Sequence, residues 1–184
     1  VFGHDVRKEA LAAKQAIGYL PENLTLYPRL TIHEFLDFLA GIRGINDAGS
    51  PESRIRELLE FFGLWGRRYI LIRECSLGML KRVGLIGALL GPQQLIVLDE
   101  PLSGLDVESI RRLRQRLRQL RQGGKTILLA SHILSFVEEI CDRVGVMHQG
   151  RLCAMGSVQE VKALAGEPAM SLEEAFFRLT SSSD

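Results

Sequence analysis

The sequence predicts an α/β fold with a mostly parallel sheet. Two continuous apolar runs, Leu95–Leu98 and Thr126–Ala130, are typical of strands buried on both faces of such a sheet. Between them, apolar residues recur at helical spacing from Val107 to Leu120, which predicts a long amphipathic helix. Strand, helix and strand in succession indicate parallel strands joined by a crossover helix.

The elements before this unit are mostly helical. A short helix over 8–16 leads into an apolar strand at 17–20, which Pro21 ends. Thr31 and Glu34 form a capping box that begins the next helix. Ser50-Pro51 begins another helix, and Gly63 suits its C-terminal end. The region from about 31 to 75 is therefore predicted to be mostly helical, with no strand pattern.

The remaining elements follow from shorter patterns. Gln149-Gly150 between two apolar runs predicts a β-hairpin, much as Asn-Gly does. Apolar spacing predicts four further helices, at 78–90, 133–141, 158–164 and 171–179.

Composition excludes several classes of protein. The 184 residues are 46% hydrophobic with a net charge of +1, which argues against disorder and against a dedicated nucleic-acid groove. The arginine-rich segment 111–116 is interpreted as the solvated face of a helix. The longest apolar runs are too short to span a bilayer. Cys75, Cys141 and Cys153 have neither disulfide-framework nor metal-ligand spacing, which favours a reduced cytosolic compartment and no zinc.

Two adjacent carboxylates, Asp99 and Glu100, end the first apolar run. The carboxyl end of a parallel strand is where α/β sheets place their ligands. An aspartate there can support a magnesium ion beside phosphates, and a second carboxylate can activate water. The alternative is a strand that ends in a solvated acidic turn. His132 follows the second apolar run, at the same predicted edge of the sheet, and favours the functional interpretation.

At these residues the sequence resembles the ATP-binding cassette (ABC) family, the ATPase subunits of ABC transporters. Leu95–Glu100 is similar to the Walker B strand, with Asp99 in the magnesium-supporting place and Glu100 in that of the catalytic glutamate. Ser103–Asp106 resembles the D-loop, and His132 the switch histidine. Ile17–Glu22 resembles the Q-loop, with Glu22 where glutamine is commoner. The resemblance implies a P-loop NTPase-like sheet, with a helical subdomain inserted between Q-loop and signature motif.

The family's signature motif, usually Leu-Ser-Gly-Gly-Gln, corresponds to Cys75-Ser-Leu-Gly-Met79. Serine and exposed amides at a helix N-terminus can bind an anion, and the resemblance implies the phosphate of an ATP held by a second subunit. Ser76 and Gly78 match the motif, whereas Leu77 replaces its first glycine and adds a side chain where backbone should approach phosphate. The alternative is a plain helix cap.

No G-x-x-x-x-G-K-[ST] occurs in the sequence, so the Walker A loop that cradles phosphates is missing. We expect that the sequence is truncated at its N-terminus and that it lacks ATPase activity as given. The alternative is a degenerate subunit that never carried the loop.

The resemblance divides residues 1–184, taken as one ABC ATPase domain, into three parts. The helical subdomain covers 23–75. The signature, Walker B, D-loop and switch region covers 76–156. A helical tail at 157–184 resembles that of drug and polysaccharide exporters.

The implied function is the ATP-binding and ATP-hydrolysing subunit of an exporter, which drives transport by a separate membrane subunit. The implied cofactors are ATP and Mg²⁺, and the partners are a second ATP-binding subunit and a transmembrane permease, at the cytoplasmic face of the membrane. No nucleic acid is expected. The alternatives are a soluble ABC ATPase that acts on ribosomes or DNA, and a catalytically silent partner subunit. The implied roles are catalysis for Glu100 and His132, metal binding for Asp99 and Glu22, and nucleotide binding for Glu22, Ser76, Gly78 and Asp106.

Overall fold

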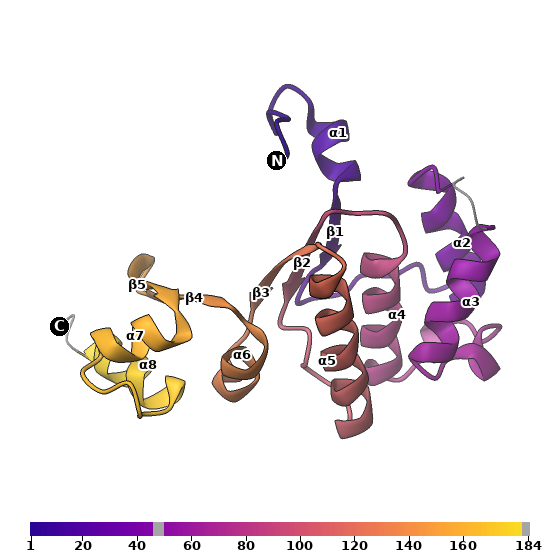
Figure 1. Cartoon of the computed structure of the whole chain (residues 1–184). Helices are drawn as coiled ribbons and strands as arrows, with labels where there is room; N and C mark the ends of the chain where they lie inside the picture. Colours follow the sequence, from indigo (N-terminus) through magenta and orange to yellow (C-terminus); the bar gives the residue numbers. More distant parts are fainter. Residues whose placement is uncertain (46–49, 182–184) are drawn as a thin grey trace. The chain divides into compact units, whose positions relative to one another are not determined.

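A computed structural model describes residues 1–45 and 50–181. The chain divides into two compact units, Val1–Ala130 and Ser131–Asp184. The first unit contains a sheet and most of the helices, and the second contains a hairpin with three helices (Figure 1).

The sheet of the first unit has three parallel strands, in the order β1 (Ile17–Leu20), β2 (Leu95–Asp99) and β3 (Thr126–Ala130). Tyr19 lies opposite Val97, which lies opposite Leu128. All three strands therefore present their carboxyl ends at one edge, and the predicted parallel α/β fold is confirmed.

Two helices cover one face of this sheet, α4 (Leu77–Leu89) and α5 (Val107–Gln122) (Figure 1). α4 packs very closely on β1, because a Cβ atom at Gly18 would overlap the carbonyl oxygen of Ala88. Glycine is therefore required at position 18, and the approach fixes α4 against the strand. The core between these layers is fully buried and includes Leu20, Ile86, Leu98, Leu113 and Leu117.

The opposite face of the sheet is not buried, which corrects the prediction of strands covered on both faces. Tyr19 and Leu128 are 52% and 60% exposed. The prediction was wrong because α4 and α5 pack on the same side of the sheet. Burial therefore alternates along β3, where Thr126, Leu128 and Ala130 are the exposed positions.

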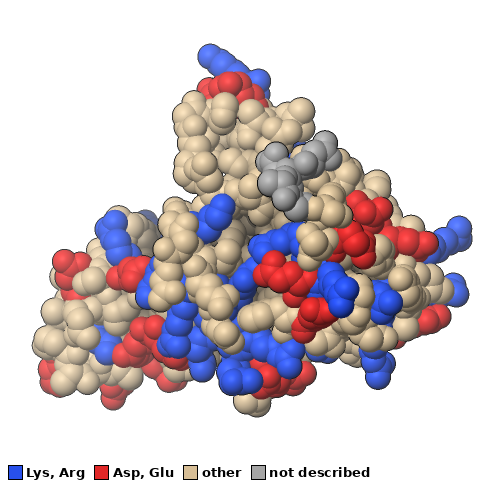
Figure 2. Space-filling model, turned by 45° about the vertical axis from the view of Figure 1, so that its right-hand side comes forward, with Lys and Arg blue, Asp and Glu red and all other residues tan. Residues whose placement is uncertain are grey.

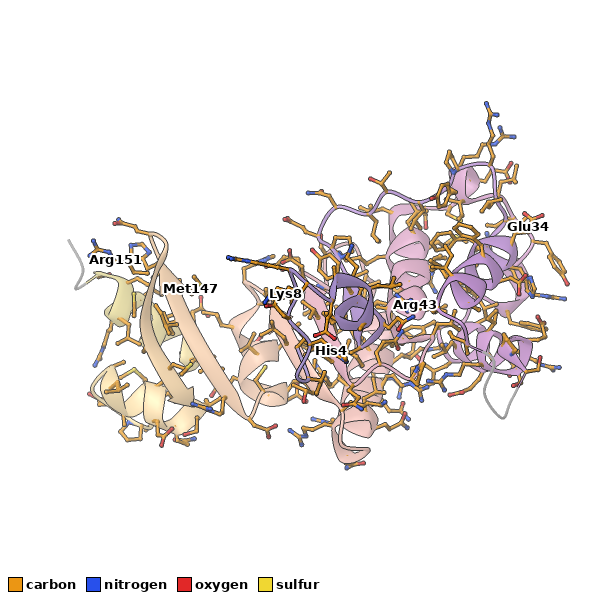
Figure 3. The ribbon with its side chains drawn as sticks, turned by 90° about the horizontal axis from the view of Figure 1, so that it is seen from above. His4, Lys8, Glu34, Arg43, Met147 and Arg151 are labelled. Carbon is orange, nitrogen blue, oxygen red and sulfur yellow. The ribbon has the colours of Figure 1, made fainter. Side chains whose placement is uncertain are left out.

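The predicted helical region is confirmed by α2 (Ile32–Ile42), α3 (Pro51–Phe61) and two 3₁₀ turns, Trp65–Arg67 and Ile72–Glu74. A short helix, α1 (Ala10–Gln15), precedes β1. The predicted capping box is present, since the Glu34 amide donates to Thr31 Oγ1 at 3.2 Å and the Thr31 amide donates to Glu34 Oε2 at 2.8 Å. Figure 3 labels Glu34 in the first turn of α2 and Arg43 just after its last.

The predicted solvated arginine face of α5 is partly wrong. Arg112 donates to the carbonyl oxygen of Phe61 at 2.7 Å, and Arg116 donates to Glu57 at 2.8 Å. The Arg116 side chain is only 13% exposed. Both side chains pack against α3, a partner that helical periodicity along α5 cannot reveal. Arg111, at 69% exposure, keeps the predicted solvated position.

The second unit contains α6 (Leu134–Ile140), the antiparallel hairpin of β4 (Arg143–His148) and β5 (Arg151–Ser157), then α7 (Val158–Leu164) and α8 (Leu172–Ser181). The predicted turn is confirmed, because Gln149 and Gly150 have φ of +46° and +76°, as a type I′ turn requires. Figure 3 labels Met147 and Arg151 on the two strands. The core of this unit consists of Val144, Val146, Ala154, Val161 and Leu172.

Charges of both signs are interspersed on the face of the molecule shown in Figure 2. Within residues 1–45 and 50–181, no helix is long and apolar enough to cross a bilayer.

Candidate functional site

The two predicted carboxylates lie at the carboxyl end of β2. Asp99 is the last residue of the strand, and Glu100 follows with φ of +43°. A non-glycine residue in this left-handed region costs about 1–3 kcal/mol and persists only where neighbouring structure holds it. Here the Glu100 amide donates to the carbonyl oxygen of Ala130 at 2.9 Å. The end of β3 thus stabilises a sharp turn that keeps both half-buried carboxylates at the sheet edge.

The predicted D-loop leads from this turn into α5. The Ser103 amide donates to the Glu100 carbonyl oxygen at 3.3 Å, and Gly104 has φ of +76°. The Asp106 carboxylate accepts the Ser109 amide at 2.7 Å and caps α5. These hydrogen bonds lower the pKa of Asp106. Asp106 thus has a structural role in this chain, and its predicted contact with nucleotide stays a prediction.

The predicted signature segment begins α4 and packs on the D-loop. A Cβ atom at Gly78 would lie 2.8 Å from the carbonyl oxygen of Gly104, so only glycine fits there. Ser76 caps the helix, because its Oγ accepts the Met79 amide at 3.3 Å. Ser76 thus caps α4, and an anion-binding role for the same residue stays a prediction.

Leu77 occupies an exposed position beside the D-loop. Its side chain is among the exposed large hydrophobic residues, at 71%. Its Cγ and Cδ2 lie 3.2 Å from where a Cβ on Gly104 would be. The side chain therefore rests on the backbone of the D-loop and projects into solvent.

Sequence reasoning missed one residue of this site, Lys81. Its side chain is 4% exposed on α4, and Nζ donates to the carbonyl oxygen of Glu22 at 3.3 Å. Burial lowers the pKa of the Lys81 ammonium, and the carboxylates of Glu22, Asp99 and Glu100 oppose this shift. Lys81 thus contacts the predicted Q-loop residue, and the carboxylates of the predicted Walker B pair favour its charged form. The available signal was the pair Lys81-Arg82 in a helix whose other residues are apolar or glycine.

The donor chemistry at this edge fits a magnesium ion. Mg²⁺ prefers oxygen ligands and is usually bound by one or two carboxylates together with substrate phosphates. Asp99, at the strand end, supplies such a carboxylate. Among the described residues no three His, Cys, Asp or Glu side chains form a cluster that could hold a metal ion by themselves.

His132 belongs to the second unit. It is exposed and lies between Ser131, whose Oγ accepts the Ile133 amide at 3.2 Å, and the start of α6. Its predicted role beside a terminal phosphate stays a prediction.

Comparison with known proteins identifies the class. A family model described as "AAA domain, putative AbiEii toxin, Type IV TA system" matches residues 8–138. This match covers more than half of the chain, which therefore belongs to the class of proteins with an AAA domain.

The particular family follows from individual relatives. A solved structure described as the ATP-binding subunit of an ABC transporter has a TM-score of 0.92 and 31% identity, over 97% of this chain and 74% of that one. The linearmycin resistance ATP-binding protein LnrL of Bacillus subtilis is 35% identical over 94% of this chain and 55% of its own length. The bacitracin transport ATP-binding protein BcrA of Enterococcus faecalis is 34% identical over 88% and 51%. The chain belongs to the ATP-binding proteins of ABC transporters, and it spans about half the length of these two curated relatives.

Proposed function

We propose that this chain is part of the ATP-hydrolysing subunit of an ABC exporter. The observation that carries the proposal is the Asp99–Glu100 pair at the carboxyl end of a parallel strand, with Glu22 and Lys81 beside it. The names of the relatives LnrL and BcrA refer to linearmycin resistance and to bacitracin transport, which supports the exporter class.

Each residue then has a specific task. Asp99 and Glu22 would hold Mg²⁺, which when bound neutralises the charge that develops on the phosphates. Glu100 would accept a proton from the attacking water, and its backbone turn keeps the carboxylate at the sheet edge. His132 would donate a hydrogen bond to the terminal phosphate.

The same residues suggest the partners of the subunit, which are a second ATP-binding subunit and a transmembrane permease. Ser76, Gly78 and Asp106 would contact an ATP held mainly by a second ATP-binding subunit. Glu22 would report the nucleotide to a transmembrane permease, and the subunit would lie at the cytoplasmic face of the membrane. Because the 184 residues contain no Walker A sequence, the chain by itself is expected not to hydrolyse ATP.

The test uses an extended chain, defined as these 184 residues joined at Val1 to the Walker A segment of a relative. We expect magnesium-dependent ATP hydrolysis, which Glu100→Gln should reduce about 100- to 10,000-fold while ATP binding remains. Light scattering should show a dimer of the Glu100→Gln protein in ATP and a monomer without it. The matched control is Glu167→Gln, at an exposed position in the second unit, which should hydrolyse at the parent rate.

Two results would contradict the proposal. Hydrolysis at the parent rate by Glu100→Gln would remove that residue from catalysis. An extended chain that binds ATP but neither hydrolyses it nor dimerises would favour the silent-partner alternative.

A further inference from the structure

Lys81 is a buried cation in an apolar helix and has no place in the mechanism above. Its neighbours along α4 are fully buried apolar residues such as Val83, Leu85 and Ile86, and Lys81 itself is 4% exposed. An ammonium group is rarely buried to this extent unless charges or hydrogen bonds compensate for its lost hydration. The groups that stabilise the buried ammonium of Lys81 therefore indicate its role.

The compensating groups come from the two segments that carry the proposed chemistry. Nζ donates to the main-chain carbonyl oxygen of Glu22, two residues after the end of β1. The carboxylates that act on its charge are those of Glu22, Asp99 and Glu100. One side chain on α4 therefore holds the loop after β1 by a hydrogen bond, and its charge is stabilised by the carboxylates at the end of β2.

Close backbone contacts at both ends of α4 hold Lys81 in a fixed position. Near its C-terminal end, Ala88 meets Gly18 so closely that no Cβ fits, and at its N-terminal end Gly78 meets Gly104 in the same way. Lys81 lies on the first turns of the helix, between these contacts. The Cα of Lys81 can therefore shift little relative to the sheet edge.

We propose that Lys81 is a positioning residue of the ATPase site, which fixes the Glu22 main chain against α4 and places a positive charge near the carboxylates of Asp99 and Glu100. The proposal rests on the function proposed above, because Glu22, Asp99 and Glu100 are the residues on which Lys81 acts. Lys81 acts through Glu22, Asp99 and Glu100, and it is not assigned a contact with nucleotide.

The first test needs no ATPase activity and uses the 184-residue chain. It is a double-mutant cycle of Lys81→Met and Asp99→Asn on the unfolding equilibrium constant in urea. When Lys81 is present, Asp99→Asn removes one of the negative charges that stabilise the buried ammonium group, and it should therefore favour unfolding. In the Lys81→Met protein, the same change relieves repulsion among carboxylates and should have little effect or the opposite one.

We expect the two effects of Asp99→Asn to differ by at least about threefold in the equilibrium constant. The matched control replaces Lys81→Met by Lys14→Met, at an exposed position of α1, and should give additive effects. Additive effects for Lys81 as well would overturn the proposal. If Lys81→Met does not fold, Lys81→Gln, which keeps a donor but lacks the charge, takes its place in the cycle.

The second test uses the extended chain. Lys81→Met should lower kcat about 10- to 100-fold, as loss of a group that orients catalytic ligands does, with KM for ATP within about threefold. Lys81→Arg keeps the charge and should recover most of kcat. A loss of thermal stability with unchanged kcat, or a change in KM alone, would show that Lys81 only supports the fold or the nucleotide. An inactive parent protein would refute the proposed function, and the cycle would still decide the role of Lys81.

Discussion

Leu77→Gly in the extended chain tests the signature segment directly. The leucine stands where the family has a glycine, at the first position of α4. If the start of this helix contacts the phosphate of an ATP in a second subunit, the side chain obstructs the approach of the backbone. We therefore expect the substitution to raise turnover.

The gain in turnover is limited by the free energy that one hydrogen-bond donor contributes to the transition state. A hydrogen-bond donor to a transition-state charge contributes about 2.7–4 kcal/mol. An obstructed but still occupied site loses only part of this, and recovery of about 1 kcal/mol corresponds to about fivefold in rate. Ser76→Ala should act in the opposite direction, since it removes both the hydroxyl and the cap of α4.

The substitution also has a cost in stability. Leu77 is 71% exposed, so its contact with Gly104 contributes about a third of a full leucine burial, roughly 0.5–1 kcal/mol. Glycine in a helix costs roughly another 0.5–1 kcal/mol. We expect a total loss of about 1–2 kcal/mol, or a Tm lower by about 2–8 °C in a chain of this size.

The assay measures turnover at saturating ATP together with Tm. Leu11→Gly is the matched control, because Leu11 is also exposed, at 74%, near the start of a helix, and lies outside the site. The control should lose stability without gaining turnover. Unchanged turnover of Leu77→Gly, with the expected loss in Tm, would refute the reasoning, because it would mean that the leucine does not obstruct phosphate.

Two further predictions concern stability. Glu138 accepts hydrogen bonds from Lys162 and from the Leu172 amide, and these hydrogen bonds lower its pKa. The ionised Glu138 therefore stabilises the folded state fully above the pKa of an unfolded glutamate, about 4.3, and this stabilisation is lost as pH falls through the pKa of Glu138 in the folded protein. Lys162→Met should lower the free energy of unfolding in urea by about 1–3 kcal/mol at pH 7, and by less at acidic pH. Arg116→Ala should destabilise the α3–α5 contact by about 1–2 kcal/mol, because it removes the ion pair with Glu57 and the packing of the side chain. Gln115→Ala, at an exposed position of α5, should cost less than about 0.5 kcal/mol, and equal losses would contradict the assigned contact.

Features specified by neighbours in the sequence could be predicted. The capping box of Thr31 and Glu34 and the turn at Gln149-Gly150 need only residues within a few positions, and both are present as expected. Asp99 and Glu100 were also identifiable, because strand ends in a parallel sheet meet at one edge whatever the remaining packing is.

Features that depend on which surfaces meet could not be predicted. The arginine face of α5 looked solvated, since nothing along that helix shows that α3 accepts Arg112 and Arg116. The exposure of Leu128 depends on both covering helices lying on one face of the sheet. The role of Lys81 could not be predicted for the same reason, because Glu22, which accepts its hydrogen bond, is distant in sequence.

Two glycines, Gly18 in β1 and Gly78 in α4, allow the close backbone contacts that hold both ends of α4 beside the site. A Cβ would not fit at Gly18 against Ala88, nor at Gly78 against Gly104, so each end of the helix is held by backbone contact. The D-loop and the first strand therefore take their separation from the length of one rigid helix. Lys81, carried on that helix, reaches the Glu22 carbonyl oxygen. Displacement of the loop after β1 would have to break this hydrogen bond or move α4, and moving α4 would shift the D-loop with it.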